Sequence, residues 1–371
     1  MSIPPEVIRD TILPQFEVEG EVLEFPPYGS GHINDTFAPK IKDKNGKVTR
    51  YILQRINTNI FRDPEGLMEN VVGVTSYLKG IICENGGDPL RETLTIIPTL
   101  DGKAFYRNPA TGNCWRMYIF VEDTISYDLV EKPEDFYMSA KSFGRFQLLL
   151  AHYPAASLHE TIPNFHNTVD RFAKLKKAIA KDKMGRAASV QPEIDFALAR
   201  EADCHVLLDL QAKGEIPLRV THNDTKLNNI LIDVKTKQGI CVIDLDTVMP
   251  GLAHYDYGDS IRFGASTALE DERDLSKVWM DLNLFEAYTK GFLEEAGAVL
   301  NDTEKANLPM GAKIMTFECG IRFLTDYLEG DTYFKTHREG QNLDRTRTQF
   351  KLVADMEAKW EEMQRIVAKY S

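Results

Sequence analysis

The sequence predicts an α+β fold in two lobes: a small antiparallel β-rich lobe over residues 1–121 and a larger, mostly helical lobe over residues 122–371. Strand patterns separated by turn signals fill the first range, whereas long amphipathic helical patterns follow from Pro133 onward. A chain of 371 residues is also long enough to bury two cores without disulfides. We therefore expect two lobes that differ in secondary structure.

The first lobe is expected to hold a short helical start, a strand meander, one helix and further strands. Asn45-Gly46 is a strong hairpin signal, and Asp101-Gly102 marks a second turn. Asp63 before a proline is typical of a helix start, and apolar residues continue at helical spacing to Leu78. The predicted strands include residues 20–28, 34–41, 49–56 and 115–121.

The second lobe shows apolar residues at helical spacing along four long segments. These segments cover residues 134–152, 191–213, 275–296 and 347–370. One short hairpin, at 230–233 and 240–244 around a Lys-Thr-Lys-Gln-Gly turn, interrupts the helices. The apolar side of the last helix is expected to pack against the lobe, so we expect a monomer or a weak homodimer.

Composition excludes several classes of protein. A formal net charge of −12 and a pI near 5.3 argue against binding to nucleic acid or to an anionic membrane, since both need a basic surface. The five cysteines have neither disulfide-framework nor zinc-site spacing, so buried free thiols are expected. The N-terminal residues lack a secretory signal pattern, and no apolar run is long enough to cross a bilayer. A cytoplasmic location is expected.

The segment His222-Asn223-Asp224-Thr225-Lys226-Leu227-Asn228-Asn229 carries the strongest chemical pattern. Asp224 can orient an acceptor hydroxyl and take its proton, and Asn229 can offer its amide oxygen to Mg²⁺. Asp244 ends the following hairpin, so its carboxylate is expected to return beside Asn229 and bind the same ion. A turn-stabilising role is the alternative for each residue, but the full spacing favours phosphoryl transfer.

With this layout the chain resembles the aminoglycoside-phosphotransferase-like branch of the kinase superfamily, which includes choline, homoserine and sugar kinases. It is similar over nearly its whole length to the N-acetylhexosamine 1-kinases, through residues 29–36, 51–55, 223–229 and 322–327. The resemblance implies a two-lobed protein-kinase-like fold. It also implies that ATP phosphorylates the anomeric hydroxyl of N-acetylglucosamine or N-acetylgalactosamine, with Asp224 as base and Mg²⁺ held by Asn229 and Asp244.

Candidate nucleotide-binding residues come from three places in the first lobe. Gly29, Ser30 and Gly31 stand between two strands, where a kinase has its phosphate-covering loop. The third strand lacks the usual lysine, so Arg55 is the candidate phosphate-binding cation and Glu69 its candidate partner. Phe120, Val121 and Glu122 resemble the connector whose backbone binds adenine. A solvated helix face is the alternative for Glu69.

The acceptor side is expected in the second lobe. By the resemblance, Arg322 and Tyr333 are sugar ligands, although Arg322 could instead pair with Asp326 on a helix surface and Tyr333 could pack in a core. The roles of His32 and Asn34 stay open. The resemblance also implies that Asp256 and Asp259 brace the catalytic loop rather than take part in the chemistry.

Two other functions remain as alternatives. Another small-alcohol kinase of the same fold would act on choline, homoserine or an aminoglycoside, but the arginines near the expected acceptor site favour a neutral acceptor. An inactive nucleotide-binding pseudokinase would normally have lost the base or a metal ligand, and Asp224, Asn229 and Asp244 are all present. The expected partners are therefore a small sugar and ATP, with neither nucleic acid nor membrane.

Overall fold

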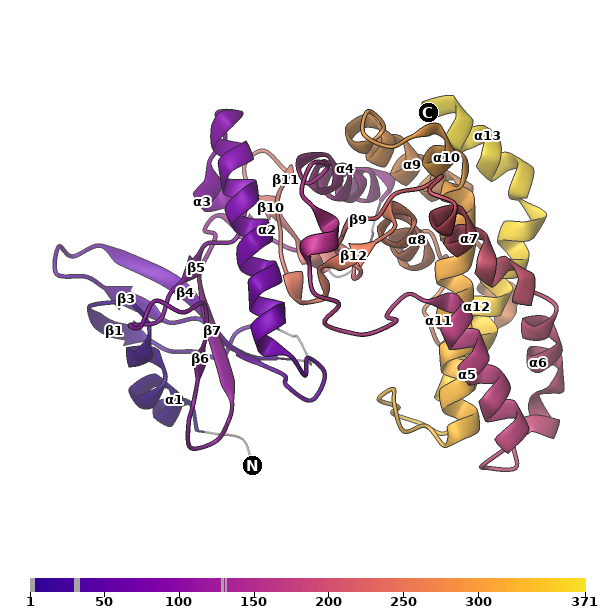
Figure 1. The fold of residues 1–371 in the computed structure, drawn as a ribbon, viewed down its shortest axis with the longest axis horizontal. Helices are drawn as coiled ribbons and strands as arrows, with labels where there is room; N and C mark the ends of the chain where they lie inside the picture. Colours follow the sequence, from indigo (N-terminus) through magenta and orange to yellow (C-terminus); the bar gives the residue numbers. More distant parts are fainter. Residues whose placement is uncertain (1–3, 30–33, 128–129, 131) are drawn as a thin grey trace. The chain divides into compact units, whose positions relative to one another are not determined.

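The structure is a computed structural model of the chain, and it describes all residues except 1–3, 30–33, 128–129 and 131. The chain divides into two compact units, each assembled from three separate stretches. The N-terminal unit comprises residues 1–125, 156–163 and 231–249, and the C-terminal unit comprises residues 126–155, 164–230 and 250–371. The α+β fold is confirmed, with an antiparallel sheet in the first unit and most helices in the second (Figure 1).

The N-terminal unit is built on a sheet whose described strands run in the order β1-β3-β4-β7-β5, with β2 beside β4 and β6 beside β7. The long strand β4 pairs with β7 from Tyr51 opposite Ile119 to Ile56 opposite Cys114. The single strand expected over 34–41 is two strands instead, because Pro39 has no N–H for a continuous ladder. The strands are β1 (Glu21–Glu24), β2 (Asp35–Phe37), β3 (Lys40–Lys42), β4 (Val48–Ile56), β5 (Ile96–Ile97), β6 (Tyr106–Arg107) and β7 (Cys114–Ile119).

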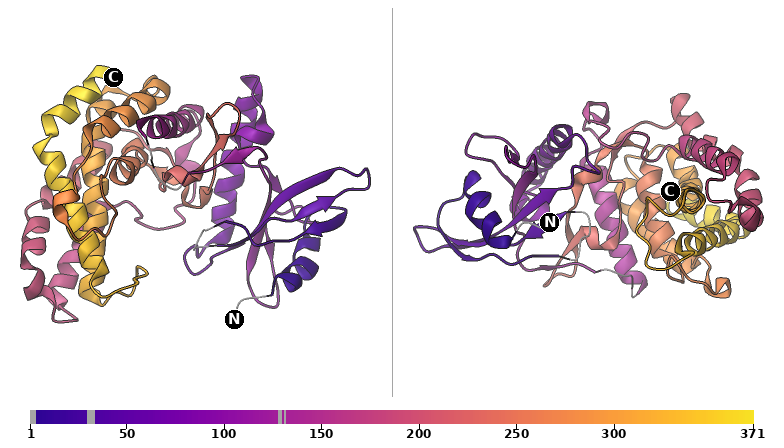
Figure 2. Two further views of the ribbon diagram at one scale, coloured as in Figure 1. Left: turned by 180° about the vertical axis from the view of Figure 1, so that it is seen from behind. Right: turned by 90° about the horizontal axis from the view of Figure 1, so that it is seen from below.

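Two helices lie on opposite faces of this sheet (Figure 2). On one face, Ile8 of α1 (Pro5–Thr11) packs in a core with Leu53 and Trp115. On the other, α2 (Pro64–Glu84) begins as predicted, because Asp63 accepts a hydrogen bond from the Gly66 amide. The alternation of the strands therefore determines which side chains face which helix.

Asn70 of α2 holds two distant stretches of chain in the N-terminal unit. Its Nδ2 donates to the carbonyl oxygens of His159 at 2.8 Å and Val248 at 3.0 Å, and its Oδ1 accepts from the His159 amide at 2.8 Å. The side chain is buried, so these bonds satisfy groups that would otherwise be costly to desolvate. One amide thereby attaches both residues 156–163 and the stretch after Asp244 to helix α2.

The predicted hairpin is present and also belongs mainly to this unit. Strands β10 (Ile230–Asp233) and β11 (Gly239–Val242) pair with each other, and β8 (Thr124–Ile125) extends β10 on its other edge. Arg91 of the short helix α3 (Pro89–Glu92) forms an ion pair with Asp233 at 2.9 Å. This contact fixes the end of β10 that leads into the turn.

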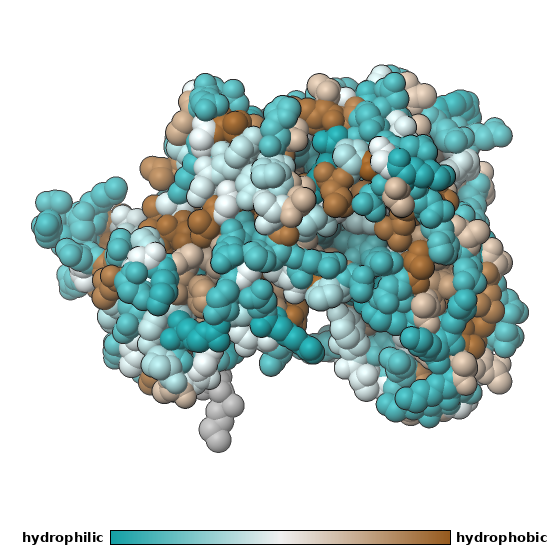
Figure 3. All heavy atoms as spheres, in the orientation of Figure 1, coloured by the Kyte–Doolittle hydropathy of each residue, from teal (hydrophilic) through white to brown (hydrophobic). Residues whose placement is uncertain are grey.

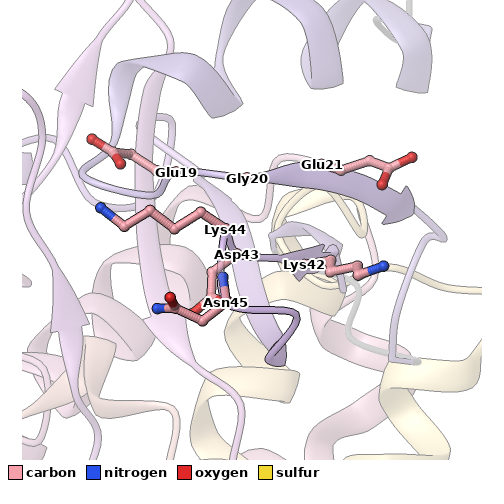
Figure 4. A pocket seen from close by; sticks show the side chains of 7 residues that line it. All are labelled: Glu19, Gly20, Glu21, Lys42, Asp43, Lys44 and Asn45. Carbon is pink, nitrogen blue, oxygen red and sulfur yellow. The ribbon is translucent and has the colours of Figure 1, made fainter.

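A surface hollow lies beside β1 and the turn between β3 and β4, and it is lined by Glu19, Gly20, Glu21, Lys42, Asp43, Lys44 and Asn45. Its charged side chains do not meet at a common centre: Glu19 and Lys44 extend to one side, and Glu21 and Lys42 extend to the other (Figure 4). Gly20 is required here, since it has a φ of +141° and a Cβ would stand 2.2 Å from the Lys42 carbonyl oxygen. The hollow therefore reflects close strand pairing.

The C-terminal unit is a helical assembly around α11 (Leu308–Glu329), which packs against α5, α8 and α12. Gly258 of α8 allows close approach, because a Cβ there would stand 2.3 Å from the Gly311 carbonyl oxygen. The other elements are α4 (Pro133–Leu149), α5 (Thr168–Lys181), α6 (Gln191–Leu198), α7 (Val206–Ala212), α8 (Ala253–Gly264), α9 (Leu282–Ala296), α10 (Asp302–Ala306), α12 (Gln341–Ala358) and α13 (Trp360–Tyr370), with β9 (Arg219–Thr221) paired to β12 (Met249–Gly251).

Three of the expected helices differ from the prediction. The helix over 191–213 breaks near Arg200, whose guanidinium stacks on Phe196 and binds Glu357. The helix over 275–296 begins only at Leu282. The Asp281 carboxylate caps it there by accepting hydrogen bonds from the amides of Asn283 and Leu284. The last segment is two helices that meet at Lys359. The strands β9 and β12 had no counterpart in the prediction.

All five cysteines are free thiols. Cys114, Cys204 and Cys241 are buried free cysteines as expected, whereas Cys319 is half-buried and Cys83 is exposed. Hydrophilic residues predominate on the face shown in Figure 3, with hydrophobic residues in separate patches. Within the described residues, no helix combines the length and apolar character needed to span a bilayer.

His254 of α8 makes folding stability depend on pH. Its Nε2 donates to the Glu304 carbonyl oxygen at 2.9 Å, and burial lowers the pKa of the imidazole from 6.5 to about 4. Between pH 6.5 and about 4, His254 is therefore protonated in the unfolded chain but largely neutral in the folded chain. We expect this group to lower the free energy of unfolding by at most about 1.4 kcal/mol per pH unit between pH 6.5 and about 4, with no contribution above pH 6.5.

Urea unfolding at several pH values measures this effect. The matched variant His254→Gln keeps an N–H donor but cannot titrate. Its stability should fall less steeply across the same window, and parallel curves for the two proteins would contradict the assignment.

Candidate active site

The predicted catalytic loop, residues 222–229, follows β9 in the C-terminal unit and is held by two carboxylates of α8. Asp256 accepts hydrogen bonds from the amides of His222 at 2.9 Å and Asn223 at 2.8 Å. Asp259, one turn later on the same helix face, accepts from the Thr225 amide at 3.1 Å. The expected bracing role of Asp256 and Asp259 is confirmed.

Further contacts make this support rigid. Gln147 of α4 donates to Asp256 at 2.8 Å and to the Val220 carbonyl oxygen at 3.0 Å. Arg262 binds Asp259 at 3.0 Å, and although burial opposes ionisation, Arg262 contributes to lowering the pKa of the Asp259 carboxyl. His222 lies edge-on to the ring of Phe143 at 5.6 Å. The loop is therefore fixed by buried polar groups of the C-terminal unit.

Asp224, the predicted base, remains accessible within this frame, with 28% of its side chain exposed. Asn229 donates from Nδ2 to the Asp224 carbonyl oxygen at 2.8 Å, which places its Oδ1 on the other side of the amide. Such an oxygen is a suitable Mg²⁺ ligand, since Mg²⁺ prefers hard oxygen donors and keeps several waters. Asp224 and Asn229 are thus brought together as the sequence predicts.

Lys226 is a site residue that the sequence prediction missed. Its Nζ lies 3.2 Å from the Asp224 carboxylate. Although burial opposes the charged form, the carboxylates of Asp224 and Asp259 raise the pKa of the Lys226 ammonium. The lysine is therefore a cation held beside the candidate base, and its position two residues after Asp224 in the motif was the available signal.

Asp244, the second predicted metal ligand, belongs to the N-terminal unit, whereas Asn229 belongs to the C-terminal unit. It has a φ of +58° and precedes the 3-10 helix Leu245–Thr247. Among the described residues no group of three or more His, Cys, Asp or Glu side chains is arranged to hold a metal. Binding of one Mg²⁺ ion by both Asn229 and Asp244 therefore stays a prediction, although their oxygens are of the kind that Mg²⁺ prefers.

The glycine turn is only partly described. Gly29 has a φ of +79°, a conformation that glycine adopts without strain. Ser30, Gly31 and His32 lie outside the described residues. Asn34 lies inside them, and its Nδ2 donates to the Asp246 carboxylate at 2.8 Å.

The expected ion pair between Arg55 and Glu69 is wrong. Arg55 pairs with Asp35, and Glu69 lies 2.6 Å from His159. The reason is strand alternation: Arg55 stands opposite Trp115, on the sheet face that packs against α1, whereas Glu69 belongs to α2 on the other face. A role for either residue in binding nucleotide stays a prediction.

The predicted connector, residues 120–122, follows β7. Arg50 stacks on the Phe120 ring at 3.6 Å and forms an ion pair with Glu122. The Phe120 amide donates to the Arg50 carbonyl oxygen at 3.0 Å, and Val121 is buried. These contacts order the segment, and adenine binding by its backbone remains a prediction.

On the acceptor side, Asp326 does not pair with Arg322. It accepts instead from the amides of Thr332, Tyr333 and Phe334 at 2.8 to 3.0 Å. The Arg322 guanidinium stands over the rings of Phe165 and Phe334, at 6.0 and 5.3 Å. Tyr333 is 70% exposed, which excludes core packing. Both residues are thus available to a ligand.

Buried charge lies next to Arg322 within the C-terminal unit. Glu318 accepts from Thr168 at 2.7 Å and contacts His166 at 2.9 Å. Burial opposes its ionisation, but His166, and to a lesser extent Arg322, lower the pKa of the Glu318 carboxyl. Arg171 loses basicity through burial and through repulsion by Arg322, which lower its pKa. Two arginines therefore face the same part of this unit.

Comparison with known proteins supports this architecture. Residues 98–279 match the Phosphotransferase enzyme family, APH. Among solved structures, a microcompartment-associated aminopropanol kinase is 15% identical, with 97% of this chain and 98% of that chain covered and a TM-score of 0.60. An aminoglycoside phosphotransferase from Alicyclobacillus acidocaldarius subsp. acidocaldarius DSM 446 is 12% identical, with 100% and 97% covered and a TM-score of 0.62.

A choline kinase from Cryptosporidium parvum Iowa II is 14% identical, with 98% of each chain covered and a TM-score of 0.57. At these identities the structural similarity shows the fold alone, whereas the family match covers the catalytic loop and Asp244. Residues 98–279, a little under half of the chain, are therefore similar to the phosphotransferase enzyme family, and the chain has the fold that these solved structures share.

Proposed function

We propose that the chain is an ATP-dependent sugar 1-kinase that phosphorylates the anomeric hydroxyl of N-acetylglucosamine or N-acetylgalactosamine. The observation that carries the kinase assignment is the braced catalytic loop, in which Asp224 is accessible while Lys226 and Asn229 are held beside it. The sugar assignment rests on the resemblance to N-acetylhexosamine 1-kinases and on the stacked Arg322 beside the exposed Tyr333.

In the proposed reaction, the acceptor oxygen attacks the γ-phosphorus of ATP. The new O–P bond forms as the bond from the γ-phosphorus to the bridging oxygen breaks, and ADP leaves with that electron pair. Asp224 orients the hydroxyl and takes its proton. Asn229 and Asp244 would hold Mg²⁺, which supplies charge neutralisation when bound. The Lys226 ammonium stabilises the negative charge of the phosphoryl group near Asp224.

The chemistry of the acceptor region favours a neutral acceptor. Arg322 and Arg171 repel each other, so an ammonium group placed near them would be disfavoured. Planar guanidinium groups donate well to carbonyl and hydroxyl oxygens, which an N-acetylhexosamine offers. An amino-alcohol kinase is the second candidate, because aminopropanol and choline kinases are among the structurally similar proteins.

An ADP-release assay tests the proposal. The acceptors are N-acetylglucosamine, N-acetylgalactosamine, glucose, galactose, choline, homoserine and an aminoglycoside. We expect the two N-acetylhexosamines to be the best acceptors and their products to lose reducing-end reactivity, since a 1-phosphate blocks that position. Preference for choline or homoserine would replace the sugar assignment, and phosphorylation elsewhere on the ring would refute the anomeric one.

Arg322→Ala should raise KM for the sugar by roughly 10-fold or more, as expected for loss of a charged hydrogen bond of about 1.5–3 kcal/mol, with KM for ATP within twofold. Steady-state kinetics with each substrate varied in turn provide the measurement. Arg347→Ala is the control, because Arg347 belongs to the same unit but pairs with Glu193. A change confined to ATP would show that Arg322 is not a sugar ligand.

A further inference from the structure

Arg116 is the most deeply buried cation among the described residues of the sheet, with 1% of its side chain exposed. It forms an ion pair with the buried Asp246, and its Nε and Nη2 donate to Gln54 Oε1 at 3.0 and 2.7 Å. Burying a guanidinium is costly unless it is paired and hydrogen-bonded, and apolar residues often stabilise such a position equally well. A fully bonded arginine here therefore suggests a role beyond stability.

The register of the sheet places Arg116 and Arg55 on opposite faces of the sheet. Gln54 stands directly opposite Arg116, so their side chains share one face, whereas Arg55 and its opposite residue Trp115 share the other. The Nη1 of Arg116 lies 3.9 Å from Met68 of α2, which identifies its face as the α2 side. The carboxylate of Asp246 reaches this same face.

Asp246 connects Arg116 to the predicted metal ligand. It stands two residues after Asp244, in the 3-10 helix that Asp244 precedes. Its second oxygen accepts from Asn34 at 2.8 Å, and Asn34 in turn accepts from the Asn57 amide at 2.9 Å. The Asp244 carboxylate also acts electrostatically on the Arg116 guanidinium. The network thus joins the start of β2, the end of β4, the centre of β7 and the Asp244 turn.

We propose that Arg116 is a positioning residue that fixes the Asp244-Leu245-Asp246 turn for binding of magnesium nucleotide. One guanidinium faces two carboxylates, so the cluster keeps a net negative charge that attracts a divalent ion. The planar guanidinium of Arg116 donates to Gln54 and Asp246 at the same time. A lysine ammonium would orient these two groups less well, because its donors are not held in one plane. The inference rests on the proposed phosphoryl transfer but not on the identity of the acceptor.

The main test compares Arg116→Lys with the wild-type protein. We expect the variant to fold and to lose about 10- to 100-fold in affinity for magnesium nucleotide, the usual effect of removing support for a metal ligand. Calorimetric titration of a non-hydrolysable ATP analogue with and without Mg²⁺ measures this directly. KM for the acceptor should stay within twofold, and the Mg²⁺ concentration for half-maximal activity should rise.

A second variant separates positioning from stability. The pair Arg116→Met with Asp246→Leu replaces the buried ions by apolar groups of similar size, which can preserve stability. We expect this protein to lose magnesium nucleotide affinity even where its melting temperature matches the wild type. The control Arg200→Met removes another arginine pair in the C-terminal unit and should leave nucleotide binding unchanged.

Unchanged nucleotide affinity and Mg²⁺ dependence in folded Arg116→Lys would overturn the proposal, as would a fully active double variant. The binding titration needs no acceptor, so it remains informative if the sugar assignment fails. If the wild type bound no magnesium nucleotide, the proposed function itself would be wrong, and this inference would fall with it.

Discussion

Asp224→Asn lowers kcat by roughly 10²–10⁴, because the amide can still orient an acceptor hydroxyl but cannot take its proton. The substitution keeps the shape of the side chain, and the main-chain support from Asp256 and Asp259 is untouched. We therefore expect the melting temperature and nucleotide affinity to stay near the wild-type values. Turnover under saturating substrates measures the effect.

Asp195→Asn is the matched control, since Asp195 is exposed in the same unit, where its carboxylate accepts a hydrogen bond from Gln191 of the same helix. It should leave kcat unchanged. Wild-type turnover in Asp224→Asn would exclude Asp224 as the base, and another group would have to accept the proton.

Asp244→Asn lowers activity by roughly 10²–10³, as expected when several kcal/mol of charge neutralisation at the phosphoryl group are lost. Asparagine tolerates the left-handed conformation almost as well as aspartate, so the φ of +58° adds little strain to the variant. The loss should be partly recovered at higher Mg²⁺ concentration. A Mg²⁺ titration of initial rates provides the measurement.

Asp123→Asn is a matched control in the same unit, because Asp123 has a similar φ of +56° but is exposed. If Asp244→Asn and Asp123→Asn showed the same Mg²⁺ dependence as the wild type, Asp244 would not be a metal ligand.

Local signals in the sequence were sufficient for much of the fold. The turn at Asn45-Gly46, the cap at Asp63 and the hairpin after Asn229 each depend on neighbouring residues, and each is present. The spacing of the catalytic loop likewise predicted that Asp224 and Asn229 meet, since five residues of chain limit their separation. The bracing role of Asp256 and Asp259 came from the resemblance to kinases that have an acid at this place, and the hydrogen bonds to the loop amides agree with it.

The errors concern contacts between residues distant in sequence. Alternation along β4 showed that Leu53 and Arg55 share a face, but only the packing of α1 shows that this face is turned away from α2. Arg116 belongs to no sequence motif, and only the strand register shows that it shares a sheet face with Gln54. The helix break near Arg200 depends on Glu357, more than 150 residues later. Such pairings have no local signature.

The division of the N-terminal unit into three stretches has a consequence for its synthesis. The chain emerges from the ribosome in order, but this unit includes residues 231–249, and Asn70 needs both His159 and Val248. After residue 125, roughly 120 further residues must be made, which takes about 6–25 s at 5–20 residues per second. Until then Asn70 lacks one of its two partners, so the N-terminal unit cannot complete its hydrogen bonds while the chain is still being made.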